Sequence, residues 1–425
     1  MKKIIYFNIA LIVTLLSSCE EKYSETVTYK INEPIFMKMS DFRASIKISQ
    51  ESREIEKQAK ICFYEDYLYI SEPEVGIHII DNSDPSNPQN IGFIELLGNA
   101  DLAIRNNQLY ADSYIDLVWF DISDPKSPSF AGRLESIFPE AIPTTQNDFG
   151  IDYEMTYNEK QEDAVVIGWN LKERTEDIED YSGGWSWPWS MEYSDLATTN
   201  SGGNSTGVNG SMSRFALYNN NLYTVINNYM TIFDLDGTEP IKAAENIYIG
   251  GNVETLFSYE DNLFMGTPTG MLIYSVEEPL NPVYQSSITH IFGCDPVIVY
   301  NDLAYVTVHS GNNCGQDANE LFIVDVSDVQ NPKRLVTYAM TSPKGLGIDK
   351  DMLFLCDDGL KIYSITSPED MYLKSLKHIT GMEGYDLIPY NNTLMMIAED
   401  GIYQYDYSDI NNIHLLSKIA FKTEE

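Results

Sequence analysis

A ten-residue pattern recurs along the chain and constrains the fold more than any other feature. Residues 79–88 read IIDNSDPSNP, and the pattern returns as WFDISDPKSP at 119–128 and IVDVSDVQNP at 323–332. Weaker copies give seven anchor positions in total, at 81, 121, 234, 275, 325, 364 and 406, which lie 40, 113, 41, 50, 39 and 42 residues apart. A period near forty residues with four short strands per unit is typical of the blades of a β-propeller.

The turn residues divide each unit into four strands. In the second unit the pattern predicts strands at 101–105, 108–112, 117–122 and 129–134, with a tight hairpin turn at Asn106 and Asn107. In the Ser-Asp-Pro turn that follows the third strand, we interpret the aspartates as caps for backbone amides, with calcium binding as the alternative. We therefore predict an all-β protein, a propeller of seven four-stranded blades, with eight blades, one of them incomplete, as the alternative.

The 113-residue step contains an insertion. Residues 152–157 and 164–170 are predicted to be the first two strands of another blade, but no third or fourth strand follows. An acidic run at 173–180 leads instead to a Gly-Gly-Trp-Ser-Trp-Pro-Trp segment and a tract rich in glycine, serine and asparagine. Loops this long within a compact domain are usually functional or disordered.

The N-terminus has the pattern of an export signal. Lys2 and Lys3 precede an apolar stretch at 4–16 that is short for a membrane span and ends in Leu-Ser-Ser-Cys. The spacing resembles a bacterial lipobox, in which Cys19 would carry the lipid; an ordinary secretory signal is the alternative. The predicted domains are a signal peptide at 1–18, an N-terminal tether and lead-in at 19–58, a propeller at 59–419 with an insertion at 171–212, and a tail at 420–425.

The repeat itself resembles a known family. The segments 75–85 (VGIHIIDNSDP) and 320–328 (ELFIVDVSD) are similar to LVIVD repeats, which occur in predicted propellers among bacterial surface lipoproteins. The resemblance covers roughly residues 59–419 and implies a propeller at the cell envelope, attached to the outer membrane by the lipid and exposed at the cell surface. It implies no catalytic residues.

The charge of the chain excludes one class of partner. The formal net charge is −37, and no basic cluster follows the predicted leader. Binding to a phosphate backbone therefore has no electrostatic basis, and nucleic acid is not an expected partner.

One end of the predicted propeller carries repeated carboxylates. An acidic residue stands at the start of several inner strands: Asp101, Glu254, Asp295 and Asp386, with Asp152 as a further candidate. These starts lie at the same end as the insertion, because the loops between second and third strands and the connections between blades share that end. The carboxylates either cap backbone amides, bind a cation or polar ligand, or act in catalysis.

The remaining candidate site residues are aromatic residues, histidines and cysteines. Alternating Trp185, Trp187 and Trp189 either stack on a sugar or peptide or cover the end of the propeller. His290 and His309 share a unit but have no third placed ligand, so the metal is unknown, and no cofactor is implied.

Four cysteines remain after Cys19. Cys294 and Cys314 are predicted to lie at the same end of the same blade, where a disulfide would close a loop of about twenty residues; two thiols are the alternative. Cys62 and Cys356 fall within apolar strand patterns and are expected to be buried thiols.

Two function hypotheses follow. The first is a non-catalytic binding or scaffolding propeller that captures a glycan, peptide or protein at the loop end of its channel. The second is a propeller hydrolase or lyase that uses the mouth carboxylates, with or without a divalent cation. The missing catalytic motifs favour the first.

Overall fold

A computed structural model describes residues 26–57, 60–145, 147, 149–158, 163–177, 208–209, 213–226, 228–250, 253–289, 296–309, 318–366 and 374–422. The chain divides into two compact units. One comprises Met1–Ile35, Thr145–Lys160 and Trp169–Trp189; the other comprises Phe36–Thr144, Gln161–Gly168 and Ser190–Glu425. Within the described residues, no helix is long and apolar enough to span a membrane.

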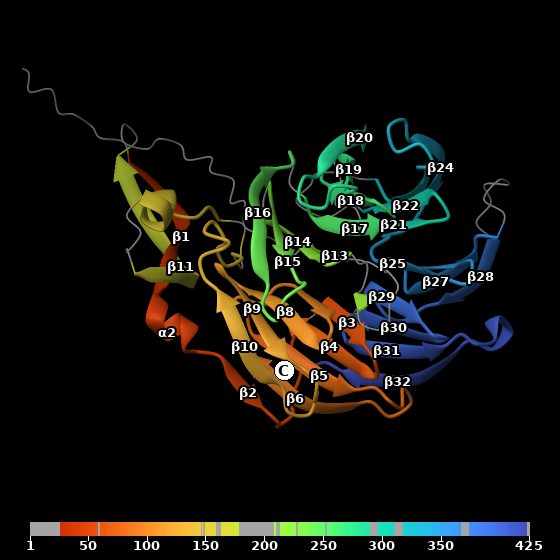
Figure 1. The fold of residues 1–425 in the computed structure, drawn as a ribbon, viewed down its shortest axis with the longest axis horizontal. Coiled ribbons are helices and arrows are strands. Elements are labelled where there is room, and N and C mark those ends of the chain that lie inside the picture. The colour runs from red at the N-terminus through yellow and green to blue at the C-terminus, as the bar shows by residue number, and fades with distance from the viewer. Residues whose placement is uncertain are drawn as a thin grey trace, which may run out of the picture. The chain divides into compact units, whose positions relative to one another are not determined.

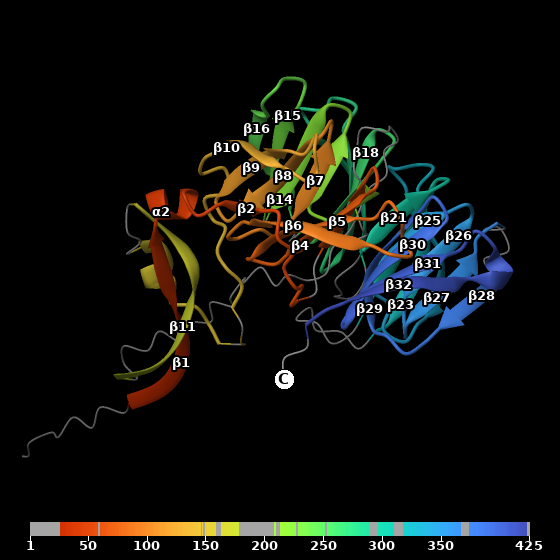
Figure 2. The same cartoon turned by 90° about the horizontal axis from the view of Figure 1, so that it is seen from below.

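The second unit is a propeller of seven blades, each with four antiparallel strands, as the repeats predict (Figure 1). The inner strand of each blade contacts the inner strands of its two neighbours, and the last blade contacts the first. The fourth strands lie at the periphery (Figures 1 and 2). Because β7 of blade 2 contacts β13 of blade 3 directly, the 113-residue step contains an insertion and the ring has no eighth blade.

The strands follow one another in sequence within every blade. Blade 1 contains β3 (Lys60–Tyr64), β4 (Tyr67–Glu72), β5 (Gly76–Asp81) and β6 (Gln89–Glu95), and blade 2 contains β7 (Leu102–Arg105), β8 (Gln108–Ser113), β9 (Asp116–Asp121) and β10 (Ser129–Leu134). Blade 3 contains β13 (Phe215–Tyr218), β14 (Asn221–Ile226), β15 (Tyr229–Asp234) and β16 (Ile241–Tyr248), and blade 4 contains β17 (Thr255–Tyr259), β18 (Asn262–Thr267), β19 (Gly270–Ser275) and β20 (Val283–Thr289). Blade 5 contains β21 (Val297–Tyr300), β22 (Leu303–Val308), β23 (Glu320–Asp325) and β24 (Lys333–Ala339), and blade 6 contains β25 (Leu346–Asp349), β26 (Met352–Cys356), β27 (Leu360–Ser364) and β28 (Lys374–Ile379). Blade 7 contains β29 (Gly384–Tyr390), β30 (Thr393–Ala398), β31 (Gly401–Asp406) and β32 (His414–Ala420).

Blade 1 carries an extra strand at each edge. The outer edge pairs with β2 (Lys47–Ser49), and the inner edge pairs with β12 (Val208–Asn209), where Val208 lies opposite Phe63. Between β1 (Thr26–Lys38) and β2, the short helix α2 (Met39–Arg43) places the Arg43 guanidinium 2.9 Å from the buried carboxylate of Asp116 in blade 2. Segments that precede the first blade and a segment of the insertion thus contact the first two blades.

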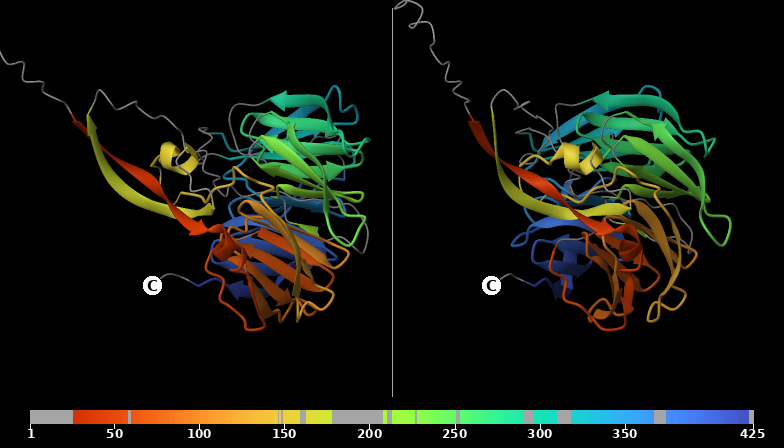
Figure 3. Two further views of the ribbon diagram at one scale, coloured as in Figure 1. Left: turned by 60° about the vertical axis from the view of Figure 1, so that its left-hand side comes forward. Right: turned by 90° about the vertical axis from the view of Figure 1, so that its left-hand side faces the viewer.

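The prediction of two blade-like strands at 152–157 and 164–170 was wrong. Glu154–Asn158 forms a π-helical turn, because Asp152 accepts a hydrogen bond from the Met155 amide and its carbonyl accepts one from Thr156. The second segment is a strand, β11 (Ala164–Asp177), but it pairs with β1 (Thr26–Lys38) in a separate two-stranded sheet (Figure 3). Alternating residues identify a strand, but they do not identify its partner.

The aspartates of the Ser-Asp-Pro turn cap backbone amides, as predicted: Asp84, for example, accepts from the Ser86 amide at 3.0 Å. The anchor aspartates, three residues earlier, form similar hydrogen bonds. The Oδ1 atom of Asp81 accepts hydrogen bonds from the amide and hydroxyl of Ser83, at 3.2 and 2.7 Å. Asp121 and Asp325 accept the same pair from the serines two residues later. These hydrogen bonds, the side-chain one first, lower the pKa of all three carboxyls.

A β-bulge recurs in every blade. The register between the third and fourth strands shifts just before the anchor position, at Ile79/Ile80 in blade 1, at Ile323/Val324 in blade 5 and at the equivalent residues elsewhere. A bulge bends the strand and increases its twist, which disfavours pairing of exposed edges between molecules.

Side chains at the ends of inner strands connect successive blades. The Tyr64 hydroxyl donates to the Asn107 side-chain oxygen at 2.7 Å and accepts from the Asn107 amide at 3.2 Å. Asn107 belongs to the hairpin turn of the next blade. The same type of contact joins Arg105 to Asn220, Tyr218 to Asp261, Tyr259 to Asp302, Tyr300 to Asp351 and Lys350 to Asn392.

The apolar core lies between adjacent blades. Strand residues of neighbouring blades form clusters, for example Ile79 of blade 1 with Ile104 of blade 2, both fully buried. Cys62 and Cys356 are buried among these residues, as predicted, and burial raises the pKa of the Cys62 thiol.

Candidate functional site

Asp101 lies where the chain enters the inner strand of blade 2, and it is engaged by protein groups. Its Oδ1 accepts from the Leu102 amide at 2.8 Å and from the Ser213 hydroxyl at 2.7 Å. Its Oδ2 accepts from the Arg214 amide at 2.6 Å and lies 3.1 Å from Nζ of Lys60. The capping interpretation is therefore confirmed for Asp101, which also connects three blades.

A second buried carboxylate lies beside it. The Asp112 Oδ1 accepts from the backbone amides of Ala100 and Asp101 at 2.7 and 2.9 Å. Burial raises the pKa of Asp112 to about 6, although these amides act in the opposite direction. Burial also lowers the pKa of Lys60 to about 8, against the attraction of Asp101. These contacts form a compact internal charge network at this end of blades 1 to 3.

The other described candidates differ in their surroundings. Asp386 is buried in blade 7, and its Oδ1 accepts from the Leu387 amide at 2.9 Å, so it too acts as a cap. Glu254 is half-buried before β17, where its amide donates to the Gly266 carbonyl. Asp152 starts the helical turn and pairs with Arg174 at 2.5 Å, so it does not begin an inner strand. The described part of the chain contains no group of three His, Cys, Asp or Glu residues able to hold a metal ion.

Several predicted site residues lie outside the described residues. They are Cys19, Trp185, Trp187, Trp189, His290, Cys294, Asp295 and Cys314. Lipidation, tryptophan stacking and the disulfide therefore stay predictions. His309 is described, and burial, with a contribution from Lys344, lowers its pKa to about 4.

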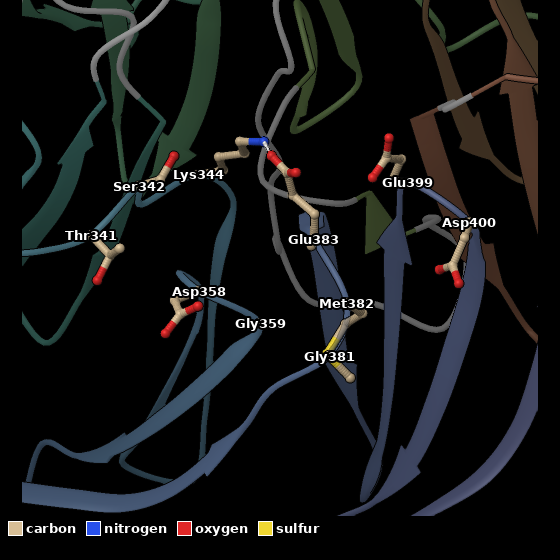
Figure 4. Close-up of a pocket in the computed structure, with 11 residues that line it drawn as sticks. Thr341, Ser342, Lys344, Asp358, Gly359, Gly381, Met382, Glu383, Glu399 and Asp400 are labelled. Atoms are coloured by element: carbon tan, nitrogen blue, oxygen red, sulfur yellow. Dashed lines mark hydrogen bonds and ion pairs between the residues drawn. The ribbon is translucent and has the colours of Figure 1, made fainter.

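A pocket opens at the predicted loop end, between blades 6 and 7. Its volume is about 550 Å³. One wall comes from the connection before β25, with Thr341, Ser342 and Lys344, and from the turn at Asp358 and Gly359. The other wall comes from residues 381–384 before β29 and from the turn 399–400 before β31 (Figure 4). Equivalent segments of two successive blades thus face each other.

Local sequence explains these walls. Gly359 has φ +100°, and a Cβ there would lie 2.2 Å from the Ile379 carbonyl oxygen. The glycine allows the turn to approach the end of the fourth strand, which places Asp358 at the rim. On the same wall the amides of Thr341 and Ser342 donate to the buried carboxylate of Asp357 at 3.0 and 2.6 Å, which fixes the connection before β25.

The charged side chains of the pocket differ in how many hydrogen bonds and ion pairs they form with the protein. Lys344 is buried, with its Nζ 2.6 Å from Glu383 and 3.9 Å from the centre of the Tyr385 ring (Figure 4). Burial alone would raise the pKa of Asp400, but hydrogen bonds from Lys418 and Tyr403 lower it. The Glu399 side chain is exposed, and its carboxylate forms no hydrogen bond or ion pair with the described residues, although the Glu399 amide donates to the Glu383 carbonyl at 2.9 Å.

Sequence reasoning missed this pocket. It identified the correct end of the propeller and one neighbouring residue, Asp386, but none of the lining carboxylates. A usable signal was present in the acidic pairs followed by glycine, Asp-Asp-Gly at 357–359 and Glu-Asp-Gly at 399–401, which stand at equivalent positions of successive units.

The fold and its loop-end pocket define the class of protein: a seven-bladed β-propeller with a polar pocket between two blades. Within that class the chain carries LVIVD repeats, because the LVIVD repeat model matches residues 58–94, 98–135 and 295–339. These matches cover blades 1, 2 and 5, which carry the strongest copies of the repeated turn.

Comparison with solved structures agrees on the fold. A protein from Lactobacillus plantarum is similar with a TM-score of 0.53 and 11% identity, over 86% of this chain and 96% of that one. The computationally designed Ika8 protein gives a TM-score of 0.49 at 9% identity, over 88% and 90% of the chains. Hsv2 from Kluyvelomyces marxianus gives 0.40 at 8% identity, over 74% and 77%. No curated protein matches the chain.

Proposed function

We propose that the protein is a non-catalytic binding propeller of the bacterial cell envelope, which holds a glycan, peptide or protein ligand at its loop end. The observation that supports this most directly is the pocket between blades 6 and 7. It is concave, has a volume typical of ligand sites, and is lined by polar groups from four separate segments.

The state of the carboxylates also supports binding. The enzyme hypothesis relied on the carboxylates at the starts of the inner strands as the groups that would face a substrate. Asp101 and Asp386, which would have filled this role, accept hydrogen bonds from backbone amides instead. Because these hydrogen bonds occupy the two carboxylates, both residues have a structural role at the ends of the inner strands.

The placement at the envelope rests on the N-terminal sequence. The Leu-Ser-Ser-Cys segment after the apolar stretch supports lipid attachment at Cys19, which would leave the propeller outside the bilayer. An outer-membrane lipoprotein of this kind presents its pocket to soluble or cell-surface ligands.

A steric variant tests the pocket without changing its charge. Thr341 is exposed on the pocket wall, so Thr341→Trp should fill the cavity while the propeller stays folded. Ligands found by glycan and peptide arrays with the full-length protein should then lose binding by on the order of tenfold or more, the effect of blocking a buried contact.

Thr238→Trp is the matched control, because Thr238 is an exposed threonine in the turn before β16, at the opposite end of blade 3. It should bind as the unmodified chain does. Retained binding by Thr341→Trp, with an unchanged melting temperature, would place the ligand elsewhere.

A further inference from the structure

The pocket between blades 6 and 7 has a charge that its own residues do not balance. Its lining contains four carboxylates, those of Asp358, Glu383, Glu399 and Asp400, against one ammonium group, that of Lys344. Lys344 is within 2.6 Å of Glu383, so this cation neutralises one carboxylate. Lys418, which lies outside the lining, pairs with Asp400. Two acidic groups remain.

These two groups lie on opposite sides of the cavity. Figure 4 shows Asp358 on one wall and Glu399 on the other, with the Lys344–Glu383 pair between them. The Asp358 side chain is 57% exposed, and the imidazole Nε2 of His378 lies 3.6 Å from its carboxylate. The same His378 nitrogen lies 2.7 Å from the Asp358 carbonyl oxygen, where it can donate as a neutral imidazole. Glu399 forms no ion pair within the described residues.

One large apolar side chain, that of Met382, lines the cavity. Met382 packs against the core cluster of blades 6 and 7, which includes Cys356 and Leu387. Gly381, with φ +96°, leaves open space where a side chain would stand. A volume of about 550 Å³ is far larger than a single ion requires and accommodates an extended side chain.

An apolar side chain beside several carboxylates complements a side chain with an aliphatic stem and a cationic end. We propose that the pocket binds a lysine or arginine side chain presented by an extended peptide segment. This inference rests on the proposed binding function and names its ligand class. The formal net charge of −37 supports it, because a strongly negative protein attracts cationic segments at long range and raises their association rate.

The direct test measures binding of a blocked tetralysine peptide to the full-length protein by calorimetry. The double variant Asp358→Asn, Glu399→Gln should weaken binding by roughly a hundredfold, about tenfold for each lost charge-assisted hydrogen bond. The same peptide with acetylated side chains should not bind. The matched control is Glu277→Gln, Glu278→Gln, which removes two exposed charges from the turn before β20. It should change affinity by no more than about twofold, which is the effect of weakened long-range attraction alone.

The outcomes separate this inference from the proposed function. If the control weakens binding as much as the pocket variant, the attraction is only the net charge and the inference is overturned. If spermine binds more tightly than tetralysine at the same site, the ligand is a free polyamine and the peptide is rejected. If tetralysine does not bind while another array ligand is lost in Thr341→Trp, the binding function stands and the cationic ligand is wrong.

Discussion

The interface between blades 7 and 1, which closes the ring, contains a buried polar pair at a position where the other interfaces hold apolar residues. Asn82 follows the anchor of blade 1, and its amide exchanges hydrogen bonds with Gln404 of blade 7, at 3.0 and 2.7 Å. Both side chains are buried. The equivalent positions in the other blades hold buried apolar or aromatic residues. The position of Asn82 is taken by Ile122, Leu235, Val276, Val326, Ile365 and Tyr407. The position of Gln404 is taken by Ile79, Trp119, Ile232, Ile273, Ile323 and Ile362.

Replacing one partner should cost more than replacing both. Asn82→Val leaves one buried donor and one buried acceptor of Gln404 without their partner, at about 1–3 kcal/mol for each group. Burial of the apolar valine side chain stabilises the fold by roughly 1 kcal/mol, so the net loss in the free energy of unfolding should be on the order of 1–5 kcal/mol. Adding Gln404→Ile restores the repeat residue on both sides and should recover most of this loss.

Denaturant unfolding of the wild type, both single variants and the double variant gives the coupling energy directly. We expect the double variant to be more stable than either single variant. A double variant whose loss equals the sum of the two single losses would refute the reasoning, because the amides would then not stabilise each other. An Asn82→Val loss below about 0.5 kcal/mol would refute it as well.

Two further predictions concern the charge network and the anchor. The pKa of Asp112 is about 6 in the folded protein, above its usual 3.8, so the folded state binds this proton more tightly than the unfolded chain. The stability that this proton contributes is present below about pH 4 and is lost as the pH rises through 6, which lowers the free energy of unfolding by up to about 3 kcal/mol. Asp112→Asn should remove this pH dependence. If the free energies of unfolding of the two proteins change in parallel from pH 4 to 7, the prediction is contradicted. Cys19→Ala should move the protein from the membrane to the soluble fraction, since stable attachment needs the acyl chains, and unchanged membrane fractionation would argue against lipidation.

Local features of this fold were predictable because they are encoded within a few residues. The Asp-Ser hydrogen bonds at Asp81 and Asp121 depend on neighbours two positions away, and the hairpin turn at Asn106 and Asn107, both with positive φ, depends on two adjacent residues. The repeat spacing then determined the number of blades. Contacts between residues far apart in the sequence could not be predicted in this way. Residues 164–170 were correctly identified as a strand, but their pairing with residues more than a hundred positions earlier has no local signal.

The candidate site shows the same division. Asp101 and Asp386 lie at the starts of inner strands, as predicted, yet Asp101 also contacts Ser213, which lies beyond the whole insertion. The pocket carboxylates were missed because their common position depends on the packing of two blades. The repeat pattern identifies residues that occupy the same structural position in every blade. The pocket is lined by neighbouring residues that do not recur in every blade.

The division between structural and ligand-facing carboxylates at this end follows from the backbone around them. A Cβ at Gly345 would lie 2.5 Å from the Tyr385 carbonyl oxygen and 2.6 Å from Oδ1 of Asp386, so only glycine allows the two blades to approach this closely. That approach buries Asp386 beside the Leu387 amide, which it caps. Glu399 stands in the turn before β31, where no described donor reaches its carboxylate, and it stays exposed at the pocket. A buried carboxylate that accepts a hydrogen bond from a backbone amide stabilises the fold, as Asp386 does. An exposed carboxylate beside a cavity, such as that of Glu399, can contact a ligand.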